Sequence, residues 1–313
     1  MFDITALGEI LIDFTPMPSC GETKIYTQNA GGAPANVLAT IAKYGGSAAF
    51  IGKVGNDMFG RFLVGKLKDL NIDTSGTVID DLHNTTLAFV NLSDDGEREF
   101  SFYRNFGADI FLSEKDIRDD IISSSKIFHF GSLSLTAEPV RSATDYAIRK
   151  AKENGCIISF DPNYRALLWN SKSTAVQTIT QYIKYADIMK VSAEEAAMIS
   201  GEKDMGKAAQ ILMDYGLKIL LITNGEKGVI YQCREGIGFV SSIKVKPVDT
   251  TGAGDIFLGT FLYEFIKSGI SLDDVMIENM EQYIGMAVRT AGLSTTVKGA
   301  IPSIPEYEEA RRI

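Results

Sequence analysis

Residues 248–262 read VDTTGAGDIFLGTFL, a glycine-rich turn that opens directly into an apolar-periodic helix. Gly252 and Gly254 remove side chains where a backbone must approach a ligand closely, and the N–H groups at a helix start, together with the helix dipole, attract an anion such as phosphate. Asp255 falls in the first turn of this helix, where a carboxylate can accept a proton from an attacking hydroxyl during phosphoryl transfer. An acidic residue that only stabilises a helix N-terminus is the competing interpretation, and this stretch alone favours neither.

A second glycine pair lies near the N-terminus. Gly31 and Gly32 stand before Pro34, which can occupy the first turn of a helix, so a plain turn-to-helix junction also explains them. Asp13 closes the first predicted strand. A carboxylate there can accept hydrogen bonds from neighbouring sugar hydroxyls, although a lone acidic residue at a strand end is usually just solvated.

Polar residues also follow a later strand, in the stretch ISFDPNYR at 158–165. Asp161, Asn163 and Arg165 come at the carboxyl end of this strand, where ligands of open α/β sheets bind. The turn chemistry of Asp-Pro-Asn explains the same residues without a ligand. Both interpretations stay open from the sequence.

Two further strand ends carry candidate residues. Ser192 to Glu195 follow one strand and fit a capping box, which does not exclude Glu195 from holding a magnesium-bound water. The stretch TNGEKG at 223–228 follows another strand and can place Thr223 and backbone amides near nucleotide phosphates, or it is a strand-turn-strand.

Short apolar runs alternate with helix-length amphipathic stretches along the chain, which predicts an α/β domain with a mostly parallel sheet. The 313 residues are enough for one large domain. The predicted strands are Ile4 to Ile12, Ser47 to Gly52, Ile127 to Phe130, Ile157 to Phe160, Ile188 to Val191 and Ile219 to Thr223. The predicted helices cover 34–44, 58–70, 139–153, 204–216, 253–268 and 273–291.

Residues 22–29 and 84–104 break this alternation. The second segment predicts two strands joined by the turn residues Asp94, Asp95 and Gly96, and so either a small β flap or an ordinary edge hairpin. The residues of this hairpin that can carry chemistry are Phe100, Phe102, Tyr103 and Arg104.

Composition excludes several function classes. The net charge of -9 argues against a general nucleic-acid or anionic-membrane surface, because a basic face is needed to displace counterions. Three widely spaced cysteines and two histidines indicate neither a disulfide framework nor a multi-histidine metal site. We find no signal peptide and no apolar run of membrane-spanning length, so we expect a cytoplasmic protein.

Six motifs together resemble one family, the ribokinase-like (PfkB-type) carbohydrate kinases, and within it the fructokinases. They are GEILIDF near the start, GGAPANV at 31–37, FIGKVGNDMFG at 50–60, DGEREFSFYRN at 95–105, FDPNYR at 160–165 and DTTGAGD at 249–255. They follow the order and spacing of the family, and the likeness covers nearly the whole chain.

The resemblance implies a single three-layer α/β/α domain over residues 1–313, with a mostly parallel central sheet. It also implies a small β-sheet lid, formed by about 14–30 and 84–106, that closes over the sugar and often forms a homodimer. By the same likeness Asp255 is the catalytic base, and the amides of Gly252, Ala253 and Gly254 stabilise the transferring phosphoryl group.

The resemblance also implies roles for further residues. The sugar-binding residues would be Asp13, Gly31, Gly32, Asn36, Phe102, Arg104 and Arg165. The residues for ATP would be Lys190, Thr223, Gly225, Gly228, Gly252, Gly254 and Asn279. Asn163 and Glu195 correspond to the Mg²⁺ environment, although Ser192 replaces the asparagine of the family's N-x-x-E motif. A K⁺ ion is a further hypothesis, with carbonyls around Asp249 and Thr251 and a loop resembling 291–303 as ligands.

The leading functional hypothesis is therefore ATP-dependent phosphorylation of fructose to fructose 6-phosphate. Related kinases for 2-keto-3-deoxygluconate, ribose or a riboside share much of the motif set. A kinase for an already phosphorylated sugar ranks lower, since it would need more cations than Arg104, Arg165 and Lys190. A non-catalytic sugar sensor is the alternative from another class, and the intact Asp255 counts against it. An oxidoreductase is remote, because no G-x-G-x-x-G follows the first strand.

Overall fold

The computed structural model describes residues 1–20, 23–92 and 98–313. Within this part, the larger sheet has nine strands in the order β13-β12-β11-β10-β9-β8-β1-β4-β5. All neighbours are parallel except β12, which is antiparallel to β11 and β13. The strands are β1 (Phe2–Leu7), β4 (Ala48–Gly55), β5 (Asp73–Asp80), β8 (Ser125–Gly131), β9 (Ile157–Asp161), β10 (Ile188–Ser192), β11 (Ile219–Thr223), β12 (Val229–Cys233) and β13 (Gly236–Val240). The predicted mostly parallel sheet is confirmed.

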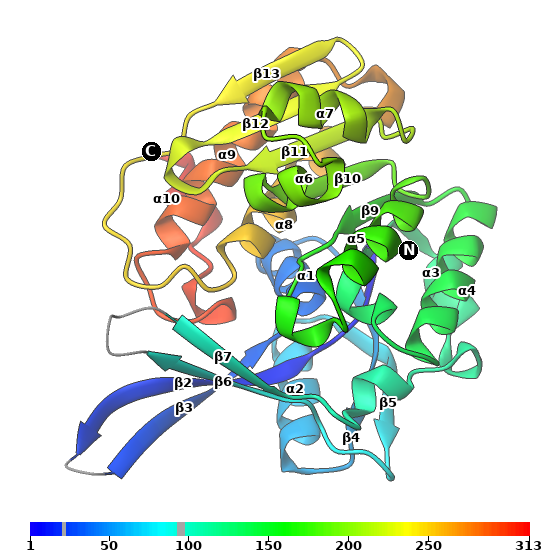
Figure 1. Cartoon of the computed structure of the whole chain (residues 1–313), viewed down its shortest axis with the longest axis vertical. Coiled ribbons are helices and arrows are strands. Elements are labelled where there is room, and N and C mark those ends of the chain that lie inside the picture. The colour runs from blue at the N-terminus through cyan, green and yellow to red at the C-terminus, as the bar shows by residue number, and fades with distance from the viewer. Residues whose placement is uncertain (21–22, 93–97) are drawn as a thin grey trace.

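Helices pack on both faces of this sheet and bury two apolar clusters, which confirms the three-layer prediction (Figure 1). Leu38 and Phe261 belong to the cluster on one face, and Ile148 and Ile183 to the cluster on the other. The first face carries α1 (Ala33–Lys43), α2 (Met58–Asp69), α8 (Ala253–Ser268), α9 (Ile277–Ser294) and α10 (Tyr307–Arg311). The second carries α3 (Asp119–Ser123), α4 (Val140–Glu153), α5 (Lys172–Ile183), α6 (Ala193–Ser200) and α7 (Met205–Met213).

A second, four-stranded sheet extends from one end of the main body (Figure 1). Its order is β3-β2-β6-β7, and its strands are β2 (Leu11–Cys20), β3 (Thr23–Gly31), β6 (Leu87–Leu92) and β7 (Arg98–Tyr103). These are the two segments that the sequence predicts as a lid, and we call this sheet the lid sheet. The predicted turn residues Asp94, Asp95 and Gly96 lie outside the described residues.

The two faces of the lid sheet differ in chemistry. Asp13 is paired with Asn29 on one side and Ala88 on the other. The next residue, Phe14, stacks on Phe89 with ring centroids 4.7 Å apart. Since successive side chains of a strand point to opposite faces, Asp13 and Phe14 lie on opposite faces of the lid sheet, and Phe14 and Phe89 belong to the aromatic face.

Two predicted elements need correction. The predicted strand from Ile4 to Ile12 is wrong as one element, because the chain leaves the large sheet after Leu7 and enters the lid sheet at Leu11. Gly8 permits this crossover, since a Cβ there would lie 2.6 Å from Cγ of Pro34 in α1. The last long helix begins at Ile277 instead of residue 273, because residues 272–274 form a separate 3-10 turn.

Among the described residues, no helix is both long and apolar enough to cross a membrane.

Candidate active site

Asp255 lies in the first turn of α8, as the glycine-rich stretch predicts. Gly252 is the N-cap residue, with φ 75°, and a Cβ there would lie 2.4 Å from Cβ of Ala300. Glycine is therefore required at this position both by the backbone conformation and by the close approach of Ala300. The Ala253 amide donates to Thr250 O at 3.3 Å, and the following N–H groups start the helix without an earlier helical carbonyl to bond.

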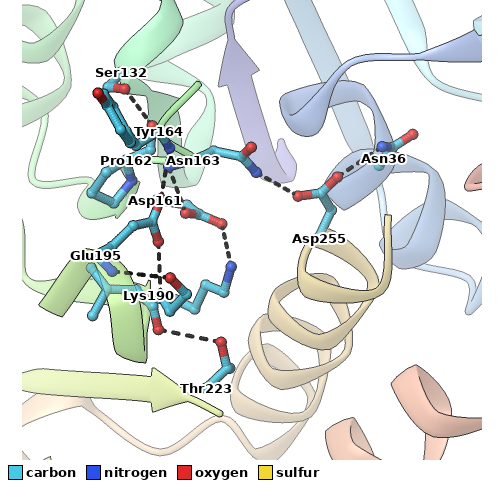
Figure 2. Close-up of polar contacts among 12 residues, drawn as sticks. Asn36, Ser132, Asp161, Pro162, Asn163, Tyr164, Lys190, Glu195, Thr223 and Asp255 are labelled. Atoms are coloured by element: carbon cyan, nitrogen blue, oxygen red, sulfur yellow. Dashed lines mark hydrogen bonds and ion pairs between the residues drawn. The ribbon is translucent and has the colours of Figure 1, made fainter. Parts of the chain in front are cut away.

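Two asparagines hold the Asp255 carboxylate from opposite sides (Figure 2). Asn36 Nδ2 donates to Oδ2 and Asn163 Nδ2 donates to Oδ1, each at 2.8 Å. Asn36 comes from α1, while Asn163 follows β9, so two elements that are far apart in the sequence hold the carboxylate. Asn36 Oδ1 is buried and has no hydrogen-bond partner among the described residues. An acceptor is therefore left available beside Asp255.

A buried ion pair lies next to this group. Lys190 of β10 is 3.0 Å from Asp161 at the end of β9, and both side chains are almost fully buried. Gly254 allows the ammonium group to reach α8, since a Cβ on Gly254 would lie 2.8 Å from Nζ of Lys190. A positive charge is thus held beside the amino end of α8, where the helix dipole adds to it.

Glu195 stabilises the backbone around this ion pair. Its Oε2 accepts from the Ser192 amide at 2.7 Å and completes a capping box at the start of α6, as the sequence indicates. Its Oε1 accepts from the Tyr164 amide at 2.6 Å and so ties α6 to the loop after β9. Among the described residues, no group of three or more His, Cys, Asp or Glu side chains converges on a metal site.

A cavity of about 820 Å³ lies in front of Asp255 and under the lid sheet. Five of the seven residues predicted to bind sugar line it: Asp13, Gly32, Asn36, Phe102 and Arg165. Gly31 is placed behind Asp13, where a Cβ would collide with the carboxylate at 2.0 Å, so its role is to leave room for that side chain. Residues that the sequence interpretation did not single out also line the cavity, among them Glu9, Tyr164, Lys172 and Met198.

A second cavity, of about 720 Å³, lies on the other side of the α8 amino end. Thr223, Gly225 and Gly228, for which the sequence predicts nucleotide contacts, line it. Its apolar part is formed by side chains that the sequence interpretation did not identify, including Ile243, Val245, Phe257, Val288 and Ala291. Thr250 and Gly254 line both cavities, so the two meet at the start of α8.

Asn279, a predicted nucleotide contact, does not line this cavity. Its side chain accepts from the Met276 amide at 3.0 Å and caps the start of α9. Val288, nine residues further along the same helix, faces the cavity instead. At about 1.5 Å per helical residue, these positions lie roughly 13 Å apart.

Arg104, predicted to bind sugar from the lid, does not line the sugar-side cavity either. Its Nε donates to Asp109 at 2.7 Å, Nη1 to Thr136 at 2.8 Å and Nη2 to Leu133 O at 3.0 Å. Asp109 also accepts from Thr86 at 2.5 Å. Arg104 therefore anchors the base of the lid sheet to the main body.

This placement predicts a stability effect for Arg104. We expect Arg104→Met to lower the free energy of unfolding by about 3–5 kcal/mol, because Asp109 would be left buried without its cation. Urea denaturation measures the change. Arg118→Met, which breaks the exposed pair with Asp120, is the matched control and should give a much smaller change. Equal effects of the two substitutions would contradict this role.

The loop proposed to hold K⁺ is tied to its predicted partner loop. Asp249 Oδ1 accepts from the Thr251 amide and Oδ2 from the Gly299 amide, each at 2.9 Å. The 249–251 segment is therefore adjacent to the loop that follows α9, which is the later part of the 291–303 stretch.

Burial raises the pKa of the carboxylates that line the sugar-side cavity. Burial and the nearby Asp161 raise the pKa of Asp255 to about 6, against the effect of Lys190. Burial raises the pKa of Asp13 to about 7, although Arg165 opposes the shift. Burial alone would lower the pKa of Lys190, but the carboxylates around it, Asp161 first, raise it, so the ammonium stays charged.

Comparison with known proteins identifies close relatives. Residues 1–307 match the pfkB family carbohydrate kinase model. The chain is 43% identical over 314 residues to a probable fructokinase-5 of Arabidopsis thaliana, covering 99% of this chain and 96% of that protein. It superposes on a fructokinase with bound ATP from Xylella fastidiosa with a TM-score of 0.92, 32% identity and coverage of 100% and 98% of the two chains. A Vibrio cholerae fructokinase double mutant with fructose, ADP and potassium bound gives a TM-score of 0.89, 33% identity and coverage of 99% and 98%.

Proposed function

The chain belongs to the pfkB family of carbohydrate kinases and is an ATP-dependent sugar kinase, and from this premise we propose that it converts fructose to fructose 6-phosphate with Asp255 as general base. One observation carries the proposal. Asp255 lies at the start of α8, where a polar cavity under the lid sheet meets a second, partly apolar cavity. A sugar in the first and a nucleotide in the second would bring hydroxyl and γ-phosphoryl group together beside one carboxylate.

In the proposed reaction, Asp255 accepts the proton of the sugar hydroxyl as its oxygen forms a bond to the γ-phosphorus of ATP. The bond from that phosphorus to the bridging oxygen breaks, and ADP leaves. Asn36 and Asn163 orient the carboxylate, and each carboxylate oxygen keeps a lone pair for the incoming proton. The raised pKa of Asp255 makes it a stronger base than an exposed aspartate.

Charge that develops on the transferred phosphoryl group would be stabilised by the start of α8 and by Lys190. Gly254, in the first helical turn, lines both cavities and lets the Lys190 ammonium approach the start of the helix. We propose Gly252, Ala253 and Gly254 as the anion hole.

On the sugar side, the polar groups suit a polyol. Asp13 offers a carboxylate from the lid sheet, Asn36 an amide oxygen that has no partner in the described part of the chain, and Arg165 a donor at the rim. Fructose is the proposed substrate because the relatives described above are named fructokinases and the Vibrio cholerae protein holds fructose.

We propose Mg²⁺ as the divalent ion, which would neutralise part of the negative charge of the phosphates. The absence of a carboxylate cluster among the described residues fits an ion bound mainly by phosphates and water, with Asn163 and Glu195 as its outer environment. K⁺ near 249–251 is a further proposal. Unchanged activity after replacement of potassium by a large organic cation would remove it.

A coupled assay of ADP release with magnesium and ATP tests the proposed substrate. Fructose, ribose, 2-keto-3-deoxygluconate and fructose 6-phosphate should be compared, and we expect the highest kcat/KM for fructose. A higher kcat/KM for another sugar would overturn the substrate while leaving the kinase. No turnover with any of them, despite sugar binding, would favour a non-catalytic sensor.

We also propose that residues 1–313 form one cytoplasmic kinase domain that dimerises through its lid sheet. Met17 and Ile25 form a cross-strand pair on the same face as Asp13, and each is 43% exposed. Apolar side chains so exposed would be buried by a second copy. Light scattering should give a dimer for the wild type and a monomer for Ile25→Glu. Ile237→Glu, at the exposed edge strand β13, is the control that should stay dimeric, and a monomeric wild type would refute the proposal.

A further inference from the structure

Glu9 is a buried carboxylate that the proposed mechanism does not use. It lies between β1 and β2, where the chain passes from the large sheet into the lid sheet, and only 4% of the residue is exposed. It nevertheless lines the sugar-side cavity, together with Asp13 and Asp255. A carboxylate buried in this way requires hydrogen-bond donors or a nearby cation.

Few groups of the protein offset the cost of burying the Glu9 carboxylate. Oε1 accepts from the Ala33 amide at the start of α1, at 3.0 Å. The charged groups that face Glu9 are Arg104 and Asp109, and all three donor nitrogens of Arg104 are directed to Asp109, Thr136 and Leu133. Within the described ranges, Glu9 therefore has no ion-pair partner. Burial raises its pKa to about 7, which is the expected response of a carboxylate in this position.

A structural role as a cap for α1 explains the contact to Ala33, and the helix dipole favours a negative charge there, but this role does not explain why the carboxylate lines the cavity. An amide oxygen could also accept from the Ala33 N–H, through a weaker hydrogen bond, and would avoid the cost of burying a carboxylate. A carboxylate that faces a cavity is favoured where a ligand brings hydroxyl donors, because a hydrogen bond to a charged acceptor is stronger than one to a neutral acceptor.

We propose that Glu9 is a second sugar-binding carboxylate, which accepts a hydrogen bond from a substrate hydroxyl that Asp13 does not bind. This inference rests on the proposed sugar kinase function. Glu9 is hydrogen-bonded to α1 of the main body, whereas Asp13 lies on β2 of the lid sheet. A polyol that contacts both carboxylates therefore links the lid sheet to the main body and places its reactive hydroxyl near Asp255.

The substitution Glu9→Gln tests this role, since it keeps an oxygen for the Ala33 amide and removes the charge. We expect the KM for the sugar to rise about 10- to 100-fold, the range for a hydrogen bond to a charged group. The KM for ATP and kcat should stay within about threefold, because the nucleotide cavity does not include Glu9. Sugar analogues that each lack one hydroxyl give the decisive measurement. Removing the hydroxyl bound by Glu9 should raise the KM of the wild type but not that of Glu9→Gln.

Glu264→Gln is the matched control, because Glu264 is also buried and its Oε1 accepts one hydrogen bond, from Tyr307 at 2.6 Å. It should leave the sugar KM unchanged. If Glu9→Gln does not fold, Glu9→Asp is measured with the same analogues and should show a reduced response to one of them. A sugar KM within twofold of the wild type, or an equal rise for every analogue, would overturn the inference. Absence of turnover by the wild type would instead refute the proposed function.

Discussion

We expect Asp255→Asn to lower turnover about 100-fold or more, while sugar and ATP still bind. The amide has nearly the shape of the carboxylate but cannot accept the proton of the attacking hydroxyl. The new NH₂ group at position 255 would face the Nδ2 of Asn36 or Asn163. A rotation of the Asn36 amide would then present its Oδ1, which has no partner among the described residues, as an acceptor for this NH₂ group. The fold of the site should therefore survive, and the loss should appear in kcat.

The coupled ADP assay measures this loss, and calorimetry measures binding of the sugar and the nucleotide. Asp145→Asn is the matched control, because Asp145 likewise accepts a hydrogen bond, from Tyr182, but lies on α4 and lines neither cavity. Its turnover should equal that of the wild type. Turnover of Asp255→Asn within threefold of the wild type would exclude Asp255 as the base.

The pH profile gives an independent check on the same residue. A general base acts in its ionised form, so activity is present above its pKa and is lost below it. Because the pKa values of Asp13 and Glu9 are raised to about 7 and that of Asp255 to about 6, kcat/KM for the sugar should begin to fall below about pH 7 and fall more steeply below pH 6. In Asp255→Asn the steeper step near pH 6 should be missing. A profile that is flat down to pH 5 in the wild type would contradict both assignments.

Lys190→Met is expected to have the next largest effect, a loss of about 100- to 1000-fold in kcat, comparable with removal of an oxyanion-hole donor. The substitution removes the positive charge beside the start of α8. It also leaves Asp161 buried without its cation and removes a charge that keeps the pKa of Asp255 from rising further. The acid limb of the pH profile should therefore move to higher pH.

Loss of stability must be separated from loss of chemistry in this variant. Lys190→Met alone should lower the free energy of unfolding by about 3–5 kcal/mol, since breaking a buried ion pair leaves an uncompensated charge. The double substitution Lys190→Met with Asp161→Asn should recover most of that stability but little of the turnover. If the double variant regained wild-type turnover, Lys190 would be a structural residue only.

Local patterns predicted most of the scaffold, because they report directly on backbone geometry. The α8 helix begins at Ala253 and ends at Ser268, as its apolar period and the flanking glycines indicate. The capping box at Ser192 correctly marks the start of α6. The crossover at Gly8 was missed, since the apolar residues on either side of Gly8 and Glu9 were interpreted as one strand. The β-branched α5 was also missed, because its residues have weak helix propensity.

The contacts of individual side chains were harder to predict than the helices and strands. Arg104 follows a lid strand and carries a charge that suits a sugar pocket, yet its position beside Asp109 directs it into a structural ion pair. Asn279 is on the predicted helix, but at the end that lies away from the cavity. Glu9 stands within the GEILIDF stretch, and a carboxylate four residues before Asp13 was the only signal for it.

The sequence by itself determined the α/β alternation, the glycine-rich start of α8 and the placement of Asp255 in its first turn, since all of these depend on residues close together in the chain. Only the tertiary structure decided which distant groups meet that carboxylate. Asn36 lies 219 residues away along the chain and Asn163 lies 92 residues away, and the packing of α1, β9 and α8 brings them within 2.8 Å. The reason is physical: local pattern sets the direction of a backbone, whereas the partner of a buried polar group is chosen by which elements pack against one another.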